Sequence, residues 1–370
     1  MNPLSQIEEL LQIGPYSLLQ AEKSARILPR LDALTRFHYE QCPAYRRIVD
    51  RAHGGLPRGP YHCLEDIPFF PVSLFKTHRL CSVPEEEVIK VLKSSGTTGQ
   101  EVSHIYLDRH TATVQAKVLV KLLQFFLGKQ RLPMVILDQK NVVSDRRSFS
   151  ARGAGILGMM QFGVRPFYAL REDMSLDHQG LHEYLQEHAG KRVLLFGFTY
   201  IIWQQLIEPL QKAGQSLDIA NGILIHSGGW KKLEDQHVST ADFNRQIAQT
   251  LGIQKCVNFY GMVEQVGSVY LENPLGYLHT PLFSEVIVRD PYTLEVLADG
   301  DVGLIQVLFV LPGSYPGHSV LTEDLGRIVG RDTPELEMKG RYFEVSGRVP
   351  KSEPRGCSDT YQPPEEPVVQ

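Results

Sequence analysis

The chain has 370 residues, of which 42% are hydrophobic and 22% are charged, and its formal net charge is −4. A chain of this length is expected to hold two or three domain-sized units with a well-buried core. This composition excludes a largely disordered chain, and the absence of a basic excess argues against nucleic acid as a partner.

The predicted elements alternate along most of the chain. Apolar residues recur at helical spacing over residues 4–52, and a lead-in rich in Gly, Pro and aromatic residues follows over Gly54–Phe75. We then expect strands and helices in turn, with strands at 88–93, 133–138, 192–198 and 222–229 and helices at 111–128, 184–188 and 201–214. Such alternation indicates an α/β fold with a mainly parallel, doubly wound sheet.

After about Gly276 the pattern changes to short β-rich runs. EVIVRD, LEVLADGDVG, LIQVLFV and GRIVG are separated by Asp-Gly, Pro-Gly and Gly signals, which predict hairpins in a smaller β subdomain. The segment from Lys351 is polar and rich in Pro and Glu. We therefore predict four parts: a helical lead-in, an α/β core, a β-rich subdomain and a short C-terminal segment, at 1–80, 81–275, 276–346 and 347–370.

The sequence contains no sign of a leader or a membrane span. MNPLSQIEELLQIG lacks a basic region and has Glu8 and Glu9 where an apolar signal core would lie. The longest apolar stretch, 193–203, is too short to cross a membrane. Five cysteines without a CxxC pair argue against a zinc site or a secreted disulfide framework. We expect a cytoplasmic protein with reduced thiols.

A loop rich in glycine and hydroxyl groups follows the first predicted strand. Its residues are Ser94, Ser95, Gly96, Thr97, Thr98 and Gly99. Glycines allow close backbone approach, and successive N–H groups can bind an anion. The P-loop pattern is not met, because Gln100 and Glu101 stand where a Lys is needed. From these residues alone, a phosphate-binding loop and a plain turn into a hairpin remain equal alternatives.

Three later motifs place charged residues beside glycine. NFYGMVE ends in Glu264, and one carboxylate is what Mg²⁺ needs beside a polyphosphate, although a lone Glu is usually a solvated charge. TEDLG places Asp324 before a glycine turn, where it could accept ribose hydroxyl protons, and Gly347 with Arg348 begins a second turn. Each motif is weak alone.

Taken in order, SSGTTG, YGMVE, TEDLG and the C-terminal GR resemble the adenylate-forming enzymes, the superfamily of the acyl-CoA ligases. A second similarity covers nearly the whole chain, from about Phe37 to Asp359. CPAYRRIV, IPFFPVSLFKTHRL, FSARGAGILG, LLFGFTYIIW, LIHSGGWKKL and GRVPKSEPRGCSD are similar to the LuxE-type acyl-protein synthetases. That resemblance implies an adenylate-forming large domain with 81–275 as the AMP-binding core, and activation of a fatty acid by ATP to an acyl-adenylate. The acyl group would then pass to a cysteine near the C-terminus and on to a LuxC-like reductase subunit, with an acyl-transferase or thioesterase subunit as a further partner.

The resemblance also implies a role for each motif. The loop 94–99 would wrap the β- and γ-phosphates, and Glu264 would hold Mg²⁺. Tyr260 would stack near the adenine, with Gly261 in the same nucleotide site. Asp324 would bind the ribose, supported by Arg348.

Residues of the HSGGWKK run are implied in the same site. Gly228 and Gly229 would flank the adenine. Lys231 and Lys232 are either solvated charges, or one of them meets the substrate carboxylate or a phosphate. His226 is more often a core histidine than a catalyst.

Only 22 residues follow Arg348, whereas acyl-CoA ligases continue for roughly another domain that carries a catalytic lysine. The resemblance therefore implies a truncated C-terminal domain and a built-in acceptor. Cys357 lies in a polar RGCSD segment where a core-filling cysteine would be out of place, and Arg355 can favour the reactive thiolate. An incidental exposed thiol is the alternative.

Other interpretations of the chain remain open. It could be a CoA ligase of the phenylacetate-CoA ligase type, which would consume CoA. It could also be a non-catalytic nucleotide-binding subunit of a reductase complex, which would release no pyrophosphate. The apolar stretches 153–164 and 194–203 suit either an acyl tunnel or plain core.

Overall fold

The computed structural model describes residues 6–94, 102–143, 151–228 and 238–349. The described chain forms two compact units. One combines residues of Met1–Gly128 with residues of Tyr260–Glu353, and the other contains Lys129–Phe259. The first unit takes residues from several of the four predicted segments, whose boundaries stay a prediction. Buried side chains of α2 bond to residues from the last third of the chain, which is why both stretches belong to one unit.

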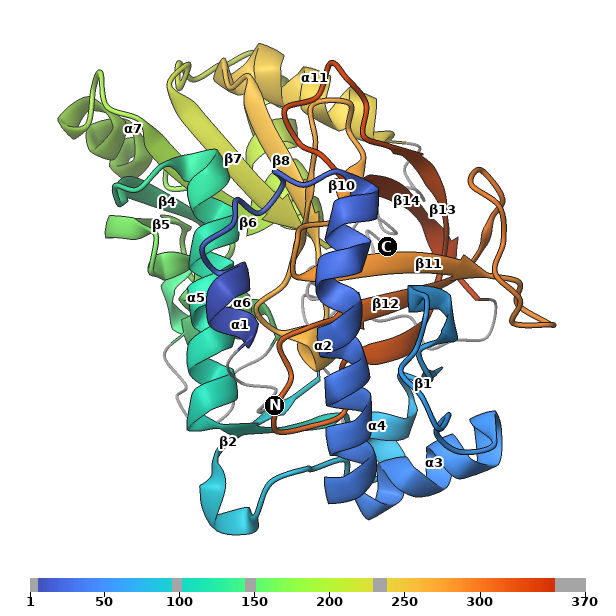
Figure 1. The fold of residues 1–370 in the computed structure, drawn as a ribbon. Helices are drawn as coiled ribbons and strands as arrows, with labels where there is room; N and C mark the ends of the chain where they lie inside the picture. Colours follow the sequence, from blue (N-terminus) through green and yellow to red (C-terminus); the bar gives the residue numbers. More distant parts are fainter. Residues whose placement is uncertain (1–5, 95–101, 144–150, 229–237, 350–370) are drawn as a thin grey trace, which may run out of the picture. The chain divides into compact units, whose positions relative to one another are not determined.

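Helices begin the first unit, where apolar spacing predicts them (Figure 1). They are α1 (Gln6–Leu10), α2 (Gln20–Gln41) and α3 (Pro43–His53). Pro43 stands at the first position of α3, where its missing N–H costs no hydrogen bond, and Gly54 ends that helix with φ of 72°. The lead-in that follows contains only short elements: η1 (Leu64–Asp66), β1 (Phe70–Pro71), α4 (Leu74–Thr77) and η2 (Glu85–Glu87).

The first predicted strand is β2 (Val88–Lys93), and it belongs to a hairpin rather than to the parallel sheet. It pairs antiparallel with β3 (His104–Asp108), and the pair ends at Lys93 opposite His104. The predicted helix after the loop is α5 (Arg109–Leu127). Its start is fixed by Asp108, whose carboxylate accepts the Thr111 N–H at 2.7 Å.

The rest of the first unit is rich in strands, as predicted for the part after about Gly276. Its strands are β9 (Tyr270–Glu272), β10 (Leu278–His279), β11 (Ser284–Arg289), β12 (Gly303–Phe309), β13 (Ser319–Arg331) and β14 (Arg341–Arg348). They are ordered β11-β12-β13-β14-β10-β9 with antiparallel pairing, and β1 adds to β13 in parallel. The run LEVLADGDVG, predicted as β-rich, forms turns with one isolated bridge, between Arg289 and Val296.

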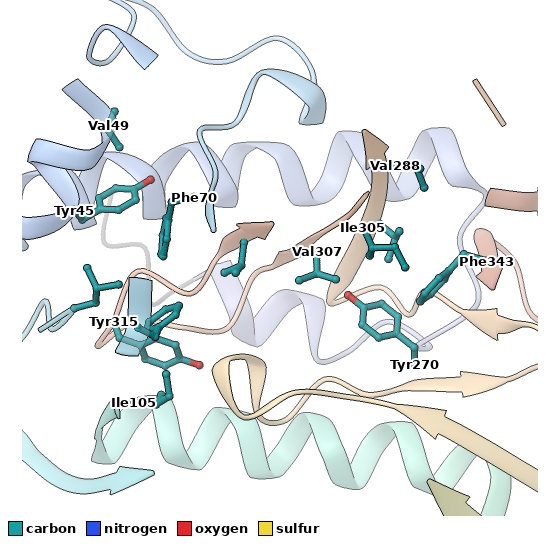
Figure 2. Packing of buried hydrophobic residues seen from close by; sticks show 14 of the residues in the cluster. Tyr45, Val49, Phe70, Ile105, Tyr270, Val288, Ile305, Val307, Tyr315 and Phe343 are labelled. Atoms are coloured by element: carbon teal, nitrogen blue, oxygen red, sulfur yellow. The ribbon is translucent and has the colours of Figure 1, made fainter. Parts of the chain in front are cut away.

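Aromatic rings from distant parts of the sequence fill the core of this unit (Figure 2). Phe70 lies 5.9 Å from Tyr45, and Phe343 lies 5.2 Å from Tyr270, measured between ring centroids. Tyr315 lies near Ile105 in the same cluster. The core is therefore built from both stretches of chain that make up the unit.

A buried ion pair joins α2 to the sheet. The Lys23 Nζ lies 3.1 Å from the Glu285 carboxylate, with both side chains at most 2% exposed, and it donates to Thr280 Oγ1 at 2.7 Å. Farther along α2, the Arg30 Nε donates to the Val310 carbonyl at 2.7 Å. Such groups are tolerated inside a protein only when they are paired, so α2 has one register on the sheet.

The second unit contains the predicted parallel sheet. Its strands are β4 (Leu132–Gln139), β5 (Gly163–Leu170), β6 (Val193–Phe198), β7 (Gly222–Ser227) and β8 (Lys255–Tyr260), ordered β8-β7-β6-β4-β5 with parallel pairing throughout. The helices between them are η3 (Lys140–Val143), α6 (Ala151–Met160), α7 (His178–Glu187), α8 (Thr199–Ile202), the π-helix η4 (Trp203–Ile207), α9 (Glu208–Lys212) and α11 (Thr240–Leu251). The α/β prediction is confirmed. β5 and α11 were not predicted.

Among the described residues, no helix combines the length and the apolar character that crossing a membrane requires.

Candidate functional site

Three of the predicted nucleotide-binding residues meet around one carboxylate. Asp324 lies in β13 and is 7% exposed. The Tyr260 hydroxyl donates to its Oδ2 at 2.6 Å, and the Arg348 Nε donates to its Oδ1 at 2.9 Å. Strand register explains the second contact, because Asp324 and Arg348 are directly opposite in the β13–β14 pair. The carboxylate is therefore held by a donor on each oxygen.

The electrostatics keep these donors protonated. Burial raises the pKa of Tyr260, and the neighbouring Asp324 charge raises it further, so the phenol retains its proton. Burial alone would lower the pKa of Arg348, but the Asp324 carboxylate outweighs it and the pKa lies above its ordinary value. The arrangement is a charged Asp–Arg pair with a neutral phenol as the second donor.

The Tyr260 ring is packed among other aromatic rings of the unit. Its centroid lies 6.0 Å from that of Tyr270 and 6.3 Å from that of Phe343. Gly261 follows directly, and a Cβ there would approach Val269 Cγ1 to 3.2 Å. The glycine thus permits close packing beside Tyr260.

Glu264, the predicted Mg²⁺ ligand, is a buried carboxylate. It belongs to η5 (Val263–Gln265) and is 6% exposed. The Ser103 side chain is among the groups that lower the pKa of this carboxyl. The Ser103 N–H donates to Ser94 Oγ at 2.9 Å, and the Ser94 N–H donates to the Ser103 carbonyl at 3.2 Å.

Several groups act on the Glu264 carboxyl. Burial raises its pKa, whereas the Ser103 hydrogen bond and the Lys76 ammonium lower it, and the Glu323 carboxylate raises it again. Lys76 lies in α4, next to Phe75, whose ring packs 6.1 Å from that of Tyr315. The Lys76 ammonium and the Glu323 carboxylate, from two distant parts of the sequence, therefore shift the pKa of Glu264 in opposite directions.

The donor set at Glu264 fits Mg²⁺ shared with a polyphosphate. Within the residues that the structure describes, no three His, Cys, Asp or Glu side chains gather closely enough to hold a metal by themselves. Mg²⁺ is commonly bound through one or two carboxylates, with phosphate oxygens and water as its other ligands. One buried carboxylate suits that coordination.

His226 and Gly228 belong to the second unit. His226, at the end of β7, is fully buried, and burial lowers its pKa to about 3, so its imidazole is neutral. Its Nδ1 lies 2.8 Å from Thr199 Oγ1, which agrees with the interpretation as a core histidine. Gly228 has φ of 66°, a left-handed conformation that favours glycine.

The two apolar stretches considered for an acyl tunnel pack on each other in the second unit. A Cβ on Gly155 of α6 would lie 3.3 Å from Phe198 Cζ at the end of β6. Gly155 therefore allows α6 to pack closely against β6.

Several predicted site residues lie outside the described part of the chain, and their roles stay predictions. They are Ser95, Gly96, Thr97, Thr98, Gly99, Gly229, Lys231, Lys232, Arg355 and Cys357. The sequence analysis did not identify two described residues, Ser103 and Lys76, that lower the pKa of Glu264. A hairpin register drawn from Ser94 would have pointed to Ser103, but Lys76 reaches the site only through tertiary packing.

The sequence resembles known proteins over almost its full length. A family model described as acyl-protein synthetase, LuxE, matches residues 4–363. A long-chain-fatty-acid–luciferin-component ligase of Aliivibrio fischeri is 23% identical over 87% of this chain and 84% of its own length. The Vibrio harveyi protein of that name is 24% identical over 96% and 92%. A phenylacetate-coenzyme A ligase of Thermus thermophilus is 43% identical over 80% of this chain and 63% of its own length.

Solved structures share the fold. A 2-hydroxyisobutyryl-CoA ligase in its postadenylation state, in complex with R3-HIB-AMP, superimposes with a TM-score of 0.67 at 18% identity, covering 90% of this chain and 69% of that one. An open conformation of such a ligase, in complex with 2-HIB-AMP and CoA, gives 0.64 at 17% identity, with 90% and 76% covered. The fold is that of the adenylate-forming ligases, as predicted.

Proposed function

Because the chain belongs to the LuxE family of acyl-protein synthetases, we propose that it joins a long-chain fatty acid to AMP and then moves the acyl group to Cys357 as a thioester. The family and the fold agree on a ligase of the adenylate-forming type. ATP is the proposed nucleotide, and a reductase subunit of the LuxC type is the proposed recipient of the acyl group. An acyl-transferase or thioesterase subunit is a further proposed partner.

The observation that carries the proposal is the Asp324 carboxylate with Tyr260 and Arg348 on its two oxygens. A carboxylate accepts up to four hydrogen bonds, so two donors fix its plane and leave acceptor sites for two ribose hydroxyls. Charge-assisted bonds of this kind are the stronger ones. The arrangement suits a residue that orients a nucleoside by its sugar.

In the first step the fatty carboxylate attacks the α-phosphorus of ATP in line, and pyrophosphate leaves. Mg²⁺ bound at Glu264 would stabilise the negative charge that develops on the leaving pyrophosphate. Asp324 holds the ribose, so that the α-phosphorus faces the attacking oxygen. This step depends on positioning and electrostatics rather than on covalent chemistry by the protein.

In the second step the Cys357 thiolate attacks the carbonyl carbon of the acyl-adenylate, the C–O bond to AMP breaks, and AMP leaves. The neighbouring Arg355 favours the thiolate. The thioester retains enough transfer potential for a partner's thiol to take the acyl chain.

Radiolabelled fatty acids of graded chain length, ATP and Mg²⁺ test both steps. We expect pyrophosphate release and a hydroxylamine-cleavable label on the wild-type chain. Cys357→Ala should still form acyl-AMP but lose the label. Cys63→Ala is the matched control, because burial and a hydrogen bond to Asp66 raise the pKa of that thiol to about 11. A label that persists on Cys357→Ala would contradict the assignment.

A CoA ligase of the phenylacetate-CoA ligase type is the second candidate, and the 43% identity to the Thermus thermophilus protein favours it. Such an enzyme would consume CoA and release an acyl-CoA. Adding CoA to the same assay separates the two, because self-acylation needs none. A non-catalytic subunit would release no pyrophosphate with any acid.

A further inference from the structure

We propose that Thr322 is a positioning residue for nucleotide binding, because its hydroxyl bridges a break in the sheet and so fixes the backbone from which Asp324 reaches the ribose. The inference deepens the proposed function and rests on it. Thr322 stands in the TEDLG motif, in which the resemblance implies a role for Asp324 alone.

The pairing of β12 with β13 is interrupted beside Asp324. The residue pairs on the two sides of Ile305 are out of register, so this one residue of β12 faces residues 322–324 of β13. A β-bulge of this kind breaks the ladder of backbone hydrogen bonds and changes the direction of side chains on the bulged strand. The direction of the Asp324 side chain therefore depends on the shape of this bulge.

The Thr322 hydroxyl bridges the interruption. It donates to the Ile305 carbonyl at 2.8 Å and accepts the Asp324 N–H at 3.1 Å. The Asp324 carbonyl lies farther from it, at 3.5 Å, so the single hydroxyl hydrogen is directed to Ile305. One side chain thus joins a carbonyl of β12 to an N–H of β13, as a ladder bond does in a regular sheet.

Other contacts hold the rest of Asp324. On the β14 side, the Val349 N–H donates to the carbonyl of the preceding residue, Glu323, at 3.0 Å. Tyr260 and Arg348 hold the two carboxylate oxygens. Thr322 therefore supplies the contact on the β12 side, and its branched Cβ allows few χ1 rotamers, which keeps the hydroxyl in place.

This arrangement predicts which nucleotide contacts depend on Thr322. A binding group has to be held within about 0.5 Å of its productive position. Thr322 acts only through the backbone of Asp324, which is proposed to bind the ribose. Loss of its hydroxyl should therefore weaken the interactions with the ribose hydroxyls and spare those with the base and the phosphates.

Calorimetric binding of ATP and, separately, of 2′,3′-dideoxy-ATP to the full-length chain with Mg²⁺ tests the inference. Thr322→Val keeps the shape of the side chain and removes the hydroxyl. We expect its affinity for ATP to fall about tenfold, as when hydrogen bonds to a charged carboxylate are weakened, and its affinity for the dideoxy nucleotide to stay unchanged. Thr322→Ser keeps the hydroxyl and should bind both nucleotides like the wild type.

Three further variants control for folding and packing. Thr322→Cys carries a weak donor and acceptor, so it should lose affinity for ATP alone, by less than Thr322→Val, and it replaces that variant if valine prevents folding. Ser314→Ala removes a fully buried hydroxyl of the same unit, which donates to the Tyr106 carbonyl at 2.8 Å, and it should change neither affinity. In an Asp324→Asn chain, Thr322→Val should have no further effect on ATP binding, because residues that act through one another are not additive.

Each result decides a different question. Equal losses for the two nucleotides, no loss at all, or a further loss in the Asp324→Asn chain would overturn the role of Thr322, while pyrophosphate release and the label on Cys357 test adenylation separately. A wild-type chain that binds both nucleotides equally would overturn the ribose contact, and the inference with it. A loss confined to ATP in a protein that releases no pyrophosphate with any fatty acid would support the role of Thr322 and refute the proposed function.

Discussion

Replacing Tyr260 by phenylalanine tests how the nucleotide is held. The substitution keeps the ring and its packing against Tyr270 and Phe343 but removes the 2.6 Å hydrogen bond to Asp324. A hydrogen bond to a charged group contributes about 1.5–3 kcal/mol. Since the 2.9 Å bond from Arg348 still holds the other oxygen, we expect a loss near the lower limit. That loss corresponds to about a tenfold rise in the KM for ATP, because 1.4 kcal/mol is a factor of ten.

The assay is pyrophosphate release with ATP and, separately, with 2′,3′-dideoxy-ATP. If Tyr260 acts by orienting Asp324 toward the ribose, the substitution should raise the KM for ATP and leave that for the dideoxy nucleotide nearly unchanged. Tyr342→Phe is a matched control in the same unit, because the Tyr342 hydroxyl bonds to Thr333 at 2.8 Å instead. An equal rise for both nucleotides would refute the reasoning and assign the effect to the adenine or to the fold.

Three further outcomes are expected. Lys76→Met should raise the pKa of Glu264, because the ammonium lowers it, so the acidic limb of the rate profile for pyrophosphate release should move to higher pH; an unmoved limb would exclude that role. Lys23→Met should lower the free energy of unfolding by about 3–5 kcal/mol in urea titrations, since it leaves a buried carboxylate without its nearest counter-charge. Burial lowers the pKa of His38 to about 3. Between pH 6.5 and 3 this histidine therefore binds a proton in the unfolded state but not in the folded state. Unfolding free energy should fall by about 1.4 kcal/mol per pH unit through that histidine as pH drops below about 6.5, and His38→Gln should reduce this slope.

The elements that the sequence predicted correctly have strong apolar patterns. The strands at 133–138, 192–198 and 222–229 match β4, β6 and β7, which are buried along nearly their whole length. β5 was not predicted, because its middle is partly exposed and its apolar and polar residues do not alternate regularly. The missed helix α11 did carry a signal: Ser239 accepts the Asp242 N–H at 3.1 Å, which is an N-cap that the sequence displays.

Some residues of the candidate site could likewise be predicted from the sequence and others could not. Motif order identified Tyr260, Asp324 and Arg348, and the structure brings them together. Lys76, whose ammonium lowers the pKa of Glu264, lies near it through the packing of α4, so its role does not follow from local residue spacing. A functional residue can be identified from the sequence when it lies in a recognisable motif. It is missed when only tertiary packing brings it to the site.

The buried polar side chains of α2 affect how the chain can acquire its structure during synthesis. Arg30 bonds to the Val310 carbonyl, 280 residues later, and His38 bonds to the Pro312 carbonyl, 274 residues later. While the ribosome is still translating the middle of the message, these groups lack the partners that make their burial favourable. The described residues of the second unit come from the single stretch Lys129–Phe259, so its parallel sheet can form before the last strands are synthesised. Helix α2 would then pack in its final position only when the last strands have been synthesised. A nascent chain stalled before residue 310 should leave α2 accessible to proteases and chaperones.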